Sequence, residues 1–209
     1  MKADSPNKNR NRWLKTLHQW HWMSSALSLI GLLLFAATGI TLNNAAWLEA
    51  RPVVINRSAT LPADVLAEIE RLDPARKTTR LPVTAEKWLD SQLGIHIGAR
   101  PAELSADEIY LSLPEPGADA WLSIDRTSGS VQYEHSRRGW IAYLNDLHKG
   151  RHTGLAWNWF IDLFAVACII FAMTGLFLLK LHSRHRLSTW PLVGLGLVGP
   201  AVLLMIFSH

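Results

Sequence analysis

Three long stretches almost without charge dominate this sequence of 209 residues. Residues 23–42 and 187–208 contain no Asp, Glu, Lys or Arg, and residues 157–179 contain only Asp162. At about 1.5 Å per helical residue, each stretch is long enough to cross the hydrocarbon core of a bilayer, which is about 30 Å thick. The sequence therefore predicts a membrane protein with three transmembrane α-helices, and it excludes a soluble enzyme.

The charges outside these stretches predict the orientation of the chain. Residues 1–22 carry five Lys or Arg and one acid, residues 180–186 carry three and none, and residues 43–156 carry 13 basic and 15 acidic side chains. Positive charge is retained on the cytoplasmic side. We therefore expect the basic N-terminus and the basic loop in the cytoplasm, with residues 43–156 and the C-terminus outside. The net charge of +4 then reports orientation, and no nucleic-acid function is indicated.

The polar segment of residues 43–156 has the pattern of a small α+β domain. Apolar residues at helical spacing predict helices at 63–72 and 84–93, the second ending at Gly94. Short β-prone runs separated by turn residues predict antiparallel strands at 95–97, 108–113, 120–124 and 131–133. The domain has no recognisable catalytic motif, so we expect His96 and His135 to be surface or packing residues.

The single cysteine, Cys168, lies inside the second apolar stretch. It excludes an intrachain disulfide, covalent haem attachment, an iron–sulfur cluster and a cysteine-rich zinc site. Residues 194–199 match the glycine pattern of dinucleotide-binding loops, but they lie in an apolar stretch that no βαβ unit follows. The sequence therefore predicts no NAD or flavin site, and electrons would come from quinol or from a membrane electron-donor protein.

An internal repeat links the first two apolar stretches. Residues 35–40 read FAATGI and residues 171–176 read FAMTGL, and each stretch is preceded by a histidine-containing segment, residues 17–21 and 147–152. If the two stretches are copies, opposite directions through the membrane would relate them by a pseudo-twofold axis in the membrane plane. The alternative is a chance likeness of two apolar helices whose small residues permit close approach.

Histidines gather at the expected cytoplasmic ends of the first two spans. His18 and His21 lead into the first, while His182 and His185 follow the second, so all four are expected at one membrane depth. Imidazoles from two antiparallel helices can supply both axial nitrogens of a non-covalently bound haem b. His21 and His182 are the first choice for the haem iron because they are nearest the apolar core. The alternative is that histidine, tryptophan and arginine only anchor the helices among lipid headgroups.

On the outer side His148 and His152 are four residues apart, which predicts that they share one helical face. The first span ends there in Asn43 and Asn44, so a second haem site lacks a ligand. That ligand could come from His209, from His96 or His135, or from another subunit of a homodimer; otherwise the iron is open on one side.

Asp162 lies inside the second span, where a carboxylate is costly unless it faces water, a cation or the bundle interior. It could accept a hydrogen bond from a haem-ligating histidine, pair with Arg151 or relay a proton. The alternative is that the interface is already hydrated at that depth.

Four motifs resemble those of the PepSY-associated transmembrane-helix family, and the resemblance covers essentially the whole chain. They are LHQWHW at 17–22, DRTSGSV at 125–131, LHKG at 147–150 and TWPL at 189–192. The resemblance implies a PepSY domain outside the cytoplasmic membrane, between spans that carry LH motifs, and marks His18 and His148 as the LH histidines. Some larger members, with at least four spans, are haem-b ferric-siderophore reductases of Gram-negative bacteria.

The main functional hypothesis is an inner-membrane haem-b protein that reduces ferric iron or a ferric siderophore in the periplasm. The first alternative is a non-enzymatic PepSY module, anchored in the lipid bilayer, that binds or regulates a peptidase or a metal-uptake component. A second alternative is a metal-uptake accessory protein that binds a metal ion through His148 and His152.

Overall fold

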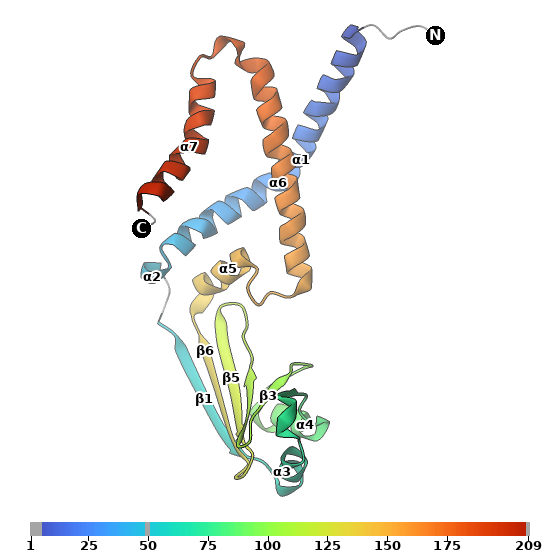
Figure 1. Cartoon of the computed structure of the whole chain (residues 1–209), viewed down its shortest axis with the longest axis vertical. Helices are drawn as coiled ribbons and strands as arrows, with labels where there is room; N and C mark the ends of the chain where they lie inside the picture. Colours follow the sequence, from blue (N-terminus) through green and yellow to red (C-terminus); the bar gives the residue numbers. More distant parts are fainter. Residues whose placement is uncertain (1–5, 49–50, 208–209) are drawn as a thin grey trace, which may run out of the picture. The chain divides into compact units, whose positions relative to one another are not determined.

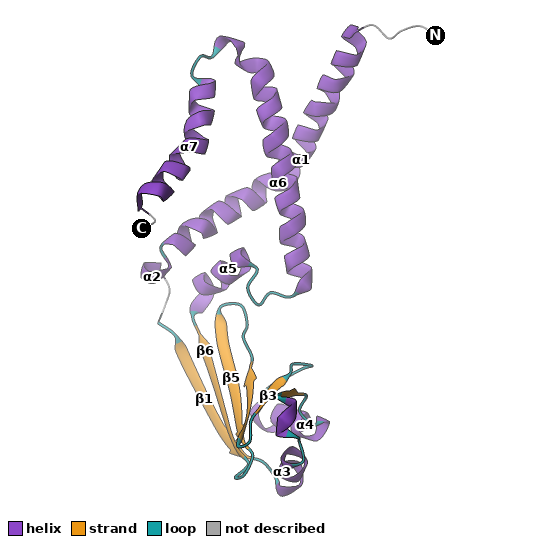
Figure 2. Cartoon of the chain, in the orientation of Figure 1, coloured by secondary structure: helices purple, strands orange, loops and turns teal. Residues whose placement is uncertain are grey.

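The computed structural model describes residues 6–48 and 51–207, and it divides into two compact units. The helix unit comprises residues 1–34 and 160–209, and the sheet unit comprises residues 35–159. Figure 1 follows the chain through both units, and Figure 2 shows that the described strands all belong to the segment between the first long helix and the later ones. Each unit is described by itself below.

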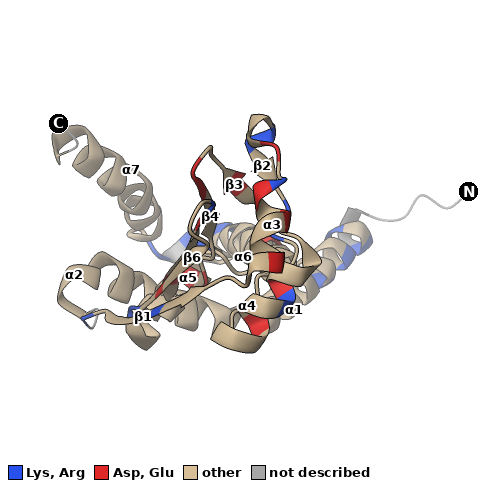
Figure 3. Cartoon of the chain, turned by 90° about the horizontal axis from the view of Figure 1, so that it is seen from below, with Lys and Arg blue, Asp and Glu red and all other residues tan. Residues whose placement is uncertain are grey.

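Three helices are long and apolar enough to cross a membrane, which confirms the number of predicted spans. They are α1 (Pro6–Asn43), α6 (Leu155–His182) and α7 (Thr189–Phe207). The predicted stretch 23–42 is therefore only the second half of α1, whose basic first half continues the same helix. Figure 3 shows Lys and Arg along that first half and neither sign of charge on α7.

Within the helix unit, α1 and α6 pack in antiparallel directions. Trp13 of α1 contacts Phe177 of α6, with ring centroids 6.4 Å apart, and further along α1 a Cβ on Gly31 would collide with the ring of Phe164. Ser24 and Ser28 are buried and hydrogen-bond back to carbonyls of the preceding helical turn, so their hydroxyls need no partner in α6. Small residues on α1 thus let the two helices approach closely.

The sheet unit is built on a six-stranded antiparallel sheet in the order β1-β6-β5-β4-β3-β2. Its strands are β1 (Val53–Thr60), β2 (Thr78–Thr79), β3 (Ala102–Leu104), β4 (Glu108–Ser112), β5 (Ala118–Asp125) and β6 (Ser130–Arg137). Two helices lie between β1 and β3 in the chain, α3 (Ala63–Glu70) and α4 (Val83–Leu93), with the short 3-10 helix η1 (Pro74–Arg76) between them. The α+β fold and the antiparallel pairing are as predicted.

One face of the sheet and the apolar sides of α3 and α4 enclose the hydrophobic core. Residues on β4 and β5 alternate between buried and exposed, as expected when only one face is covered. Fully buried members include Ile69 of α3, Leu89 of α4 and Leu122 of β5. The other face carries polar and aromatic side chains, among them Tyr110 and Trp121, whose rings stack 6.3 Å apart.

The turn between β5 and β6 is closed by the carboxylate of Asp125. It accepts hydrogen bonds from the backbone N–H groups of Thr127 and Ser128 and from the Ser128 hydroxyl, which lower the pKa of Asp125. Beside it, the buried guanidinium of Arg126 donates to carbonyl oxygens at the end of α3 and in the β3–β4 turn: Ile69, Glu70, Leu72, Ser105 and Ala106. The turn therefore ties the strands to α3.

The predicted strand at 95–97 is wrong. Gly94 ends α4 in the left-handed conformation, with φ at 64°, and the N–H of Ile95 bonds back to the carbonyl of Leu89. Ile95 and Ile97 do bury their side chains in the core, which explains the alternating pattern, but the segment pairs with no described strand. The sequence analysis also missed β1, the short strands β2 and β3, and α5 (Gly139–Lys149).

Candidate functional site

In the helix unit, His21 of α1 is held by α6. Its Nδ1 lies 3.0 Å from Oγ1 of Thr174, and its ring stacks on Phe171 with centroids 4.9 Å apart. A Cβ on Gly175 would lie 3.3 Å from Cε1 of His21, so the missing side chain makes room for the imidazole. Phenylalanine, threonine and glycine of one helical segment therefore surround one histidine.

In the sheet unit, His148 of α5 is held in the same way by α1. Its Nδ1 lies 2.6 Å from Oγ1 of Thr38, and its ring contacts Phe35 with centroids 4.8 Å apart. A Cβ on Gly39 would lie 3.8 Å from Cε1 of His148. We call the two surrounding segments the Phe-Thr-Gly cradles, formed by residues 35, 38, 39 and by residues 171, 174, 175.

These contacts give the internal repeat a structural role. The two cradles are the matching residues of FAATGI and FAMTGL. The cradle in FAATGI holds His148, which precedes FAMTGL in the chain, and the cradle in FAMTGL holds His21, which precedes FAATGI. Of the candidate histidines, the structure thus selects His21 and His148 as an equivalent pair. Threonines 38 and 174 were missed as site residues, although their place in the repeat was a visible signal.

Each threonine hydroxyl lies within hydrogen-bond distance of a helical carbonyl as well as of the histidine. Oγ1 of Thr174 lies 2.7 Å from the carbonyl oxygen of Ile170 and 3.0 Å from that of Phe171, and Oγ1 of Thr38 lies 3.1 Å from that of Phe35. A hydroxyl has one proton to donate, so a hydroxyl that donates to its helical carbonyl accepts from Nδ1–H of the histidine.

The consequence lies at the other nitrogen of each ring. With Nδ1 protonated, Nε2 of the neutral imidazole has a free lone pair. Among the described residues, no group hydrogen-bonds to Nε2 of His21 or His148. In this tautomer each ring would present Nε2 to a metal ion, with a hydrogen bond behind that nitrogen.

His18 and His182 form a second pair in the helix unit. Their ring centroids are 6.1 Å apart and their planes are nearly perpendicular, at 89°. Nδ1 of each lies 2.9 Å from a carbonyl oxygen one turn earlier, of Leu14 and of Leu178, and because a carbonyl oxygen only accepts, Nδ1 of each ring is the donor.

The expectation that the cytoplasmic histidines share one depth is only partly met. His182 lies beside His18, whereas His21 contacts Thr174, which lies about two helical turns before His182 in α6. His182 belongs to the end of α6, and His185 ends the 3-10 helix η2 (Ser183–His185), where its side chain is not among those described. The structure therefore places the first-choice histidines, His21 and His182, in different contacts.

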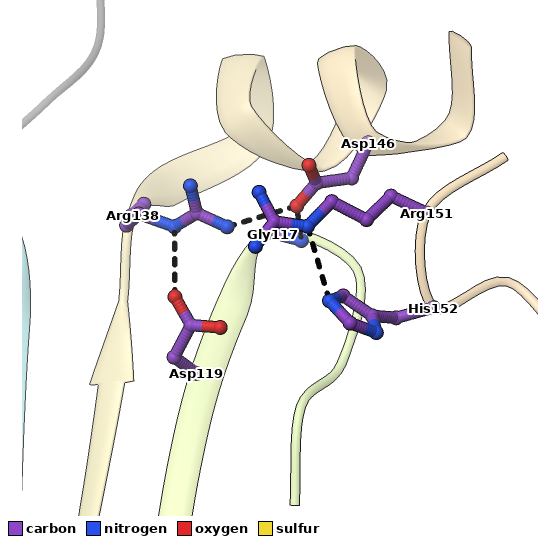
Figure 4. A network of polar contacts seen from close by, with 6 residues as sticks. All are labelled: Gly117, Asp119, Arg138, Asp146, Arg151 and His152. Atoms are coloured by element: carbon purple, nitrogen blue, oxygen red, sulfur yellow. Dashed lines mark hydrogen bonds and ion pairs between the residues drawn. The ribbon is translucent and has the colours of Figure 1, made fainter. Parts of the chain in front are cut away.

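The expectation that His148 and His152 share a helical face is wrong. Helix α5 ends at Lys149 because Gly150 adopts the left-handed conformation, with φ at 66°. His152 lies beyond this stop with φ at 59°, and its Nε2 accepts a hydrogen bond from Nε of Arg151 (Figure 4). Among the described residues, no group of three or more His, Cys, Asp or Glu is placed to bind a metal ion.

The other candidates lie elsewhere. Asp162 is exposed on α6, and no described residue of the helix unit gives it a hydrogen bond or ion pair. His96 is an exposed surface residue whose Nδ1 lies 3.0 Å from Asp90, and His135 stacks on Tyr133, as expected for surface and packing histidines. His209 lies outside the described residues.

Helix α5 connects the sheet to the cradle around His148. The buried carboxylate of Asp146 accepts hydrogen bonds from the Gly117 N–H and from Arg138, each at 2.9 Å, and Arg138 also lies 3.7 Å from Asp119 (Figure 4). One residue earlier, Oδ1 of the buried Asn145 accepts from the Thr41 hydroxyl of α1 at 2.8 Å. Asn145 thus binds α5 to α1, and Asp146 binds it to the sheet. Together they hold the helix that carries His148.

The sequence matches one protein-family model over most of its length. The model of the PepSY_TM-like family matches residues 12–209, which include all three apolar helices, the sheet unit and both cradles. The chain belongs to the PepSY_TM-like family. The search of curated proteins and the search of solved structures each gave no match. In this PepSY_TM-like chain the two motif histidines differ in setting, because His148 lies in a cradle and His18 lies beside His182.

Proposed function

We propose that this PepSY_TM-like chain is a haem-b electron-transfer protein of the bacterial cytoplasmic membrane that reduces ferric iron, free or in a siderophore. The observation that carries the proposal is the pair of cradled histidines. Each has its Nδ1 within hydrogen-bond distance of a threonine hydroxyl and no described hydrogen-bond partner at Nε2, in a helix long and apolar enough to span the membrane or in direct contact with one.

The residues present fit a non-covalent haem b. A ligating imidazole coordinates through one nitrogen while the other donates a hydrogen bond that fixes the ring, and the threonine hydroxyls beside Nδ1 of His21 and of His148 can accept that bond. Phe171 and Phe35 supply apolar surface beside the rings. His18 and His182, whose Nδ1 atoms lie beside backbone carbonyl oxygens, are the remaining candidate ligands, and a second subunit of a homodimer is a further source.

When bound, haem supplies a one-electron carrier inside the membrane. The chain's own residues would hold the group: the threonines of the cradles would keep the imidazoles of His21 and His148 in place, and the phenylalanines would exclude water. Quinol or a membrane electron-donor protein would supply the electrons, because the sequence predicts no NAD or flavin site. Ferric iron or a ferric siderophore would accept them.

The proposed orientation follows from the charges. The basic first half of α1 and the basic η2 region would face the cytoplasm, since positive residues are retained there. The sheet unit and the C-terminus would then lie in the periplasm. Electron transfer from the cytoplasmic side toward the sheet unit would deliver reducing equivalents where ferric complexes arrive.

The test is an absorption spectrum of the full chain, purified in detergent, before and after addition of dithionite. We expect a Soret band and sharpened α and β bands on reduction. His21→Ala and His148→Ala should each lower the haem content per protein, whereas His96→Ala, which removes an exposed histidine of the sheet unit, should not.

A spectrum that stays blank after haem is added would reject the proposal. It would leave the non-enzymatic alternative, a membrane-anchored PepSY module that binds a peptidase or a metal-uptake component. Full haem retention in both histidine variants would reject the ligand assignment alone.

A further inference from the structure

The core face of the sheet is not covered along its whole length. On β6 this face carries Val131, Tyr133, His135 and Arg137 in turn, and exposure rises from the fully buried Val131 to the exposed Arg137. Helices α3 and α4 lie at the Val131 end of the strands, while α5 lies at the Arg137 end (Figure 1). Near α5 the same face therefore forms a groove in place of a core.

The groove has a volume of about 460 Å³, within the usual range for small-molecule sites. It is lined by His135 and Arg137 of β6, by Trp140 and Tyr143 of α5, and by the β4–β5 turn with Glu115. A Cβ on Gly117 of that turn would lie 2.7 Å from the Tyr143 backbone, so the turn contacts α5 and closes that end.

Both signs of charge line the groove. No described residue forms a hydrogen bond or an ion pair with the side chain of Arg137 or of Glu115. Burial raises the pKa of Tyr133, which lies further along the same face of β6, and the negative charge of Glu115 raises it further, while the positive charge of Arg57 lowers it. A ligand that satisfies both side chains must carry an anionic and a cationic group.

The position of the groove indicates where such a ligand comes from. Helix α5 is bound to the last turns of an apolar span, through Asn145 to Thr41 and through His148 to Thr38. Its side chains Trp140 and Tyr143 are 70% and 46% exposed, and Trp47 of the short helix α2 (Ala45–Leu48), which also contacts α5, is 90% exposed. Exposed Trp and Tyr at the end of a span are typical of the headgroup layer.

We propose that the groove binds the zwitterionic headgroup of a membrane phosphatidylethanolamine. The phosphate lies against Arg137 and His135, the ammonium donates to Glu115, and the faces of Trp140 and Tyr143 enclose the cation. The acyl chains extend along the apolar end of α1. The lipid thereby holds α5, and with it His148, against the sheet.

The test is native mass spectrometry of the delipidated full chain, with equimolar dioleoyl phosphatidylethanolamine and dioleoyl phosphatidylglycerol added in detergent. We expect the ethanolamine lipid to form the dominant one-to-one adduct. Arg137→Gln and Glu115→Gln should each weaken that adduct about tenfold, the effect of losing one charge-assisted hydrogen bond. Arg137→Lys should retain it in part.

Matched controls separate this site from general membrane anchoring. Arg100→Gln removes an exposed arginine elsewhere in the sheet unit, and Trp47→Ala removes an exposed tryptophan outside the groove. Both should leave the adduct unchanged, whereas Trp140→Ala should weaken it. Adducts are counted on haem-free and haem-loaded protein, so failure of the haem proposal does not affect this result.

Three outcomes would overturn the proposal. One is an unchanged adduct in both the Arg137→Gln and the Glu115→Gln variants. Another is equal or stronger binding of phosphatidylglycerol, which has no cationic group for Glu115. The third is displacement by soluble O-phosphoethanolamine at a concentration equal to that of the lipid, because the groove would then be a site for a soluble ligand.

Discussion

At the scale of single residues, two threonines each contact a histidine. Oγ1 of Thr38 and Oγ1 of Thr174 both lie within hydrogen-bond distance of a helical carbonyl oxygen and of Nδ1 of a histidine. Serine or threonine inside an apolar helix usually has no such external contact, because the back-bond to the preceding turn already satisfies it. A hydroxyl that keeps its back-bond accepts from Nδ1–H, which leaves Nε2 of the imidazole free to bind a ligand.

Replacing Thr174 tests this role. Thr174→Val keeps the shape but removes the acceptor, so Nδ1–H of His21 loses its partner. If His21 binds haem as proposed, haem affinity should fall about 10- to 100-fold, as on loss of hydrogen bonds behind metal ligands in other proteins. Haem titration followed by the Soret band measures it.

Thr174→Ser is the matched control, because it retains the hydroxyl and should bind haem nearly as the parent chain does. Equal affinities of the valine and serine variants would contradict the positioning role of the hydroxyl.

At the scale of elements, one buried cation joins α3 to the β5–β6 turn. The guanidinium of Arg126 replaces the missing hydrogen-bond donors at the C-terminus of α3, where carbonyl oxygens have no partner within the helix. No glycine cap ends α3, in contrast to α4 and α5, which end at Gly94 and Gly150. The position of α3 therefore depends on a side chain more than 50 residues away in the sequence.

Arg126→Gln should destabilise the sheet unit by about 3 kcal/mol, because several buried carbonyl oxygens lose a charged donor. Pulse proteolysis in urea measures the effect, and the midpoint should fall by about 1–2 M. Arg71→Gln is the control, since Arg71 is exposed at the end of the same helix. A midpoint equal to that of the control would show that water replaces the guanidinium without cost.

At the scale of the whole molecule, the three apolar helices and the distribution of charge predict one orientation. Single cysteines in a Cys168→Ser background test it. A membrane-impermeant maleimide added to spheroplasts should label Ser58→Cys in the sheet unit, whereas Arg184→Cys in η2 should react only after lysis. The reverse pattern would place the sheet unit in the cytoplasm and would contradict the proposed direction of electron transfer.

The sequence by itself determined the features that depend on composition and on short-range pattern. The three spans follow from the length of charge-poor stretches, and α3, α4 and the strands β4, β5 and β6 follow from apolar periodicity and turn residues. It also exposed the repeat that contains both cradles. These signals are local, because each reflects how a short segment meets water, lipid or its own backbone.

Only the tertiary structure decided which groups meet. Pairing with β6 makes a strand of β1, whose exposed residues give no alternating pattern, and the lack of such a partner leaves residues 95–97 irregular. The same holds for the site, where His21 meets Thr174 across 153 residues and His148 meets Thr38 across 110. Such contacts depend on how distant helices pack, which a short sequence pattern does not specify.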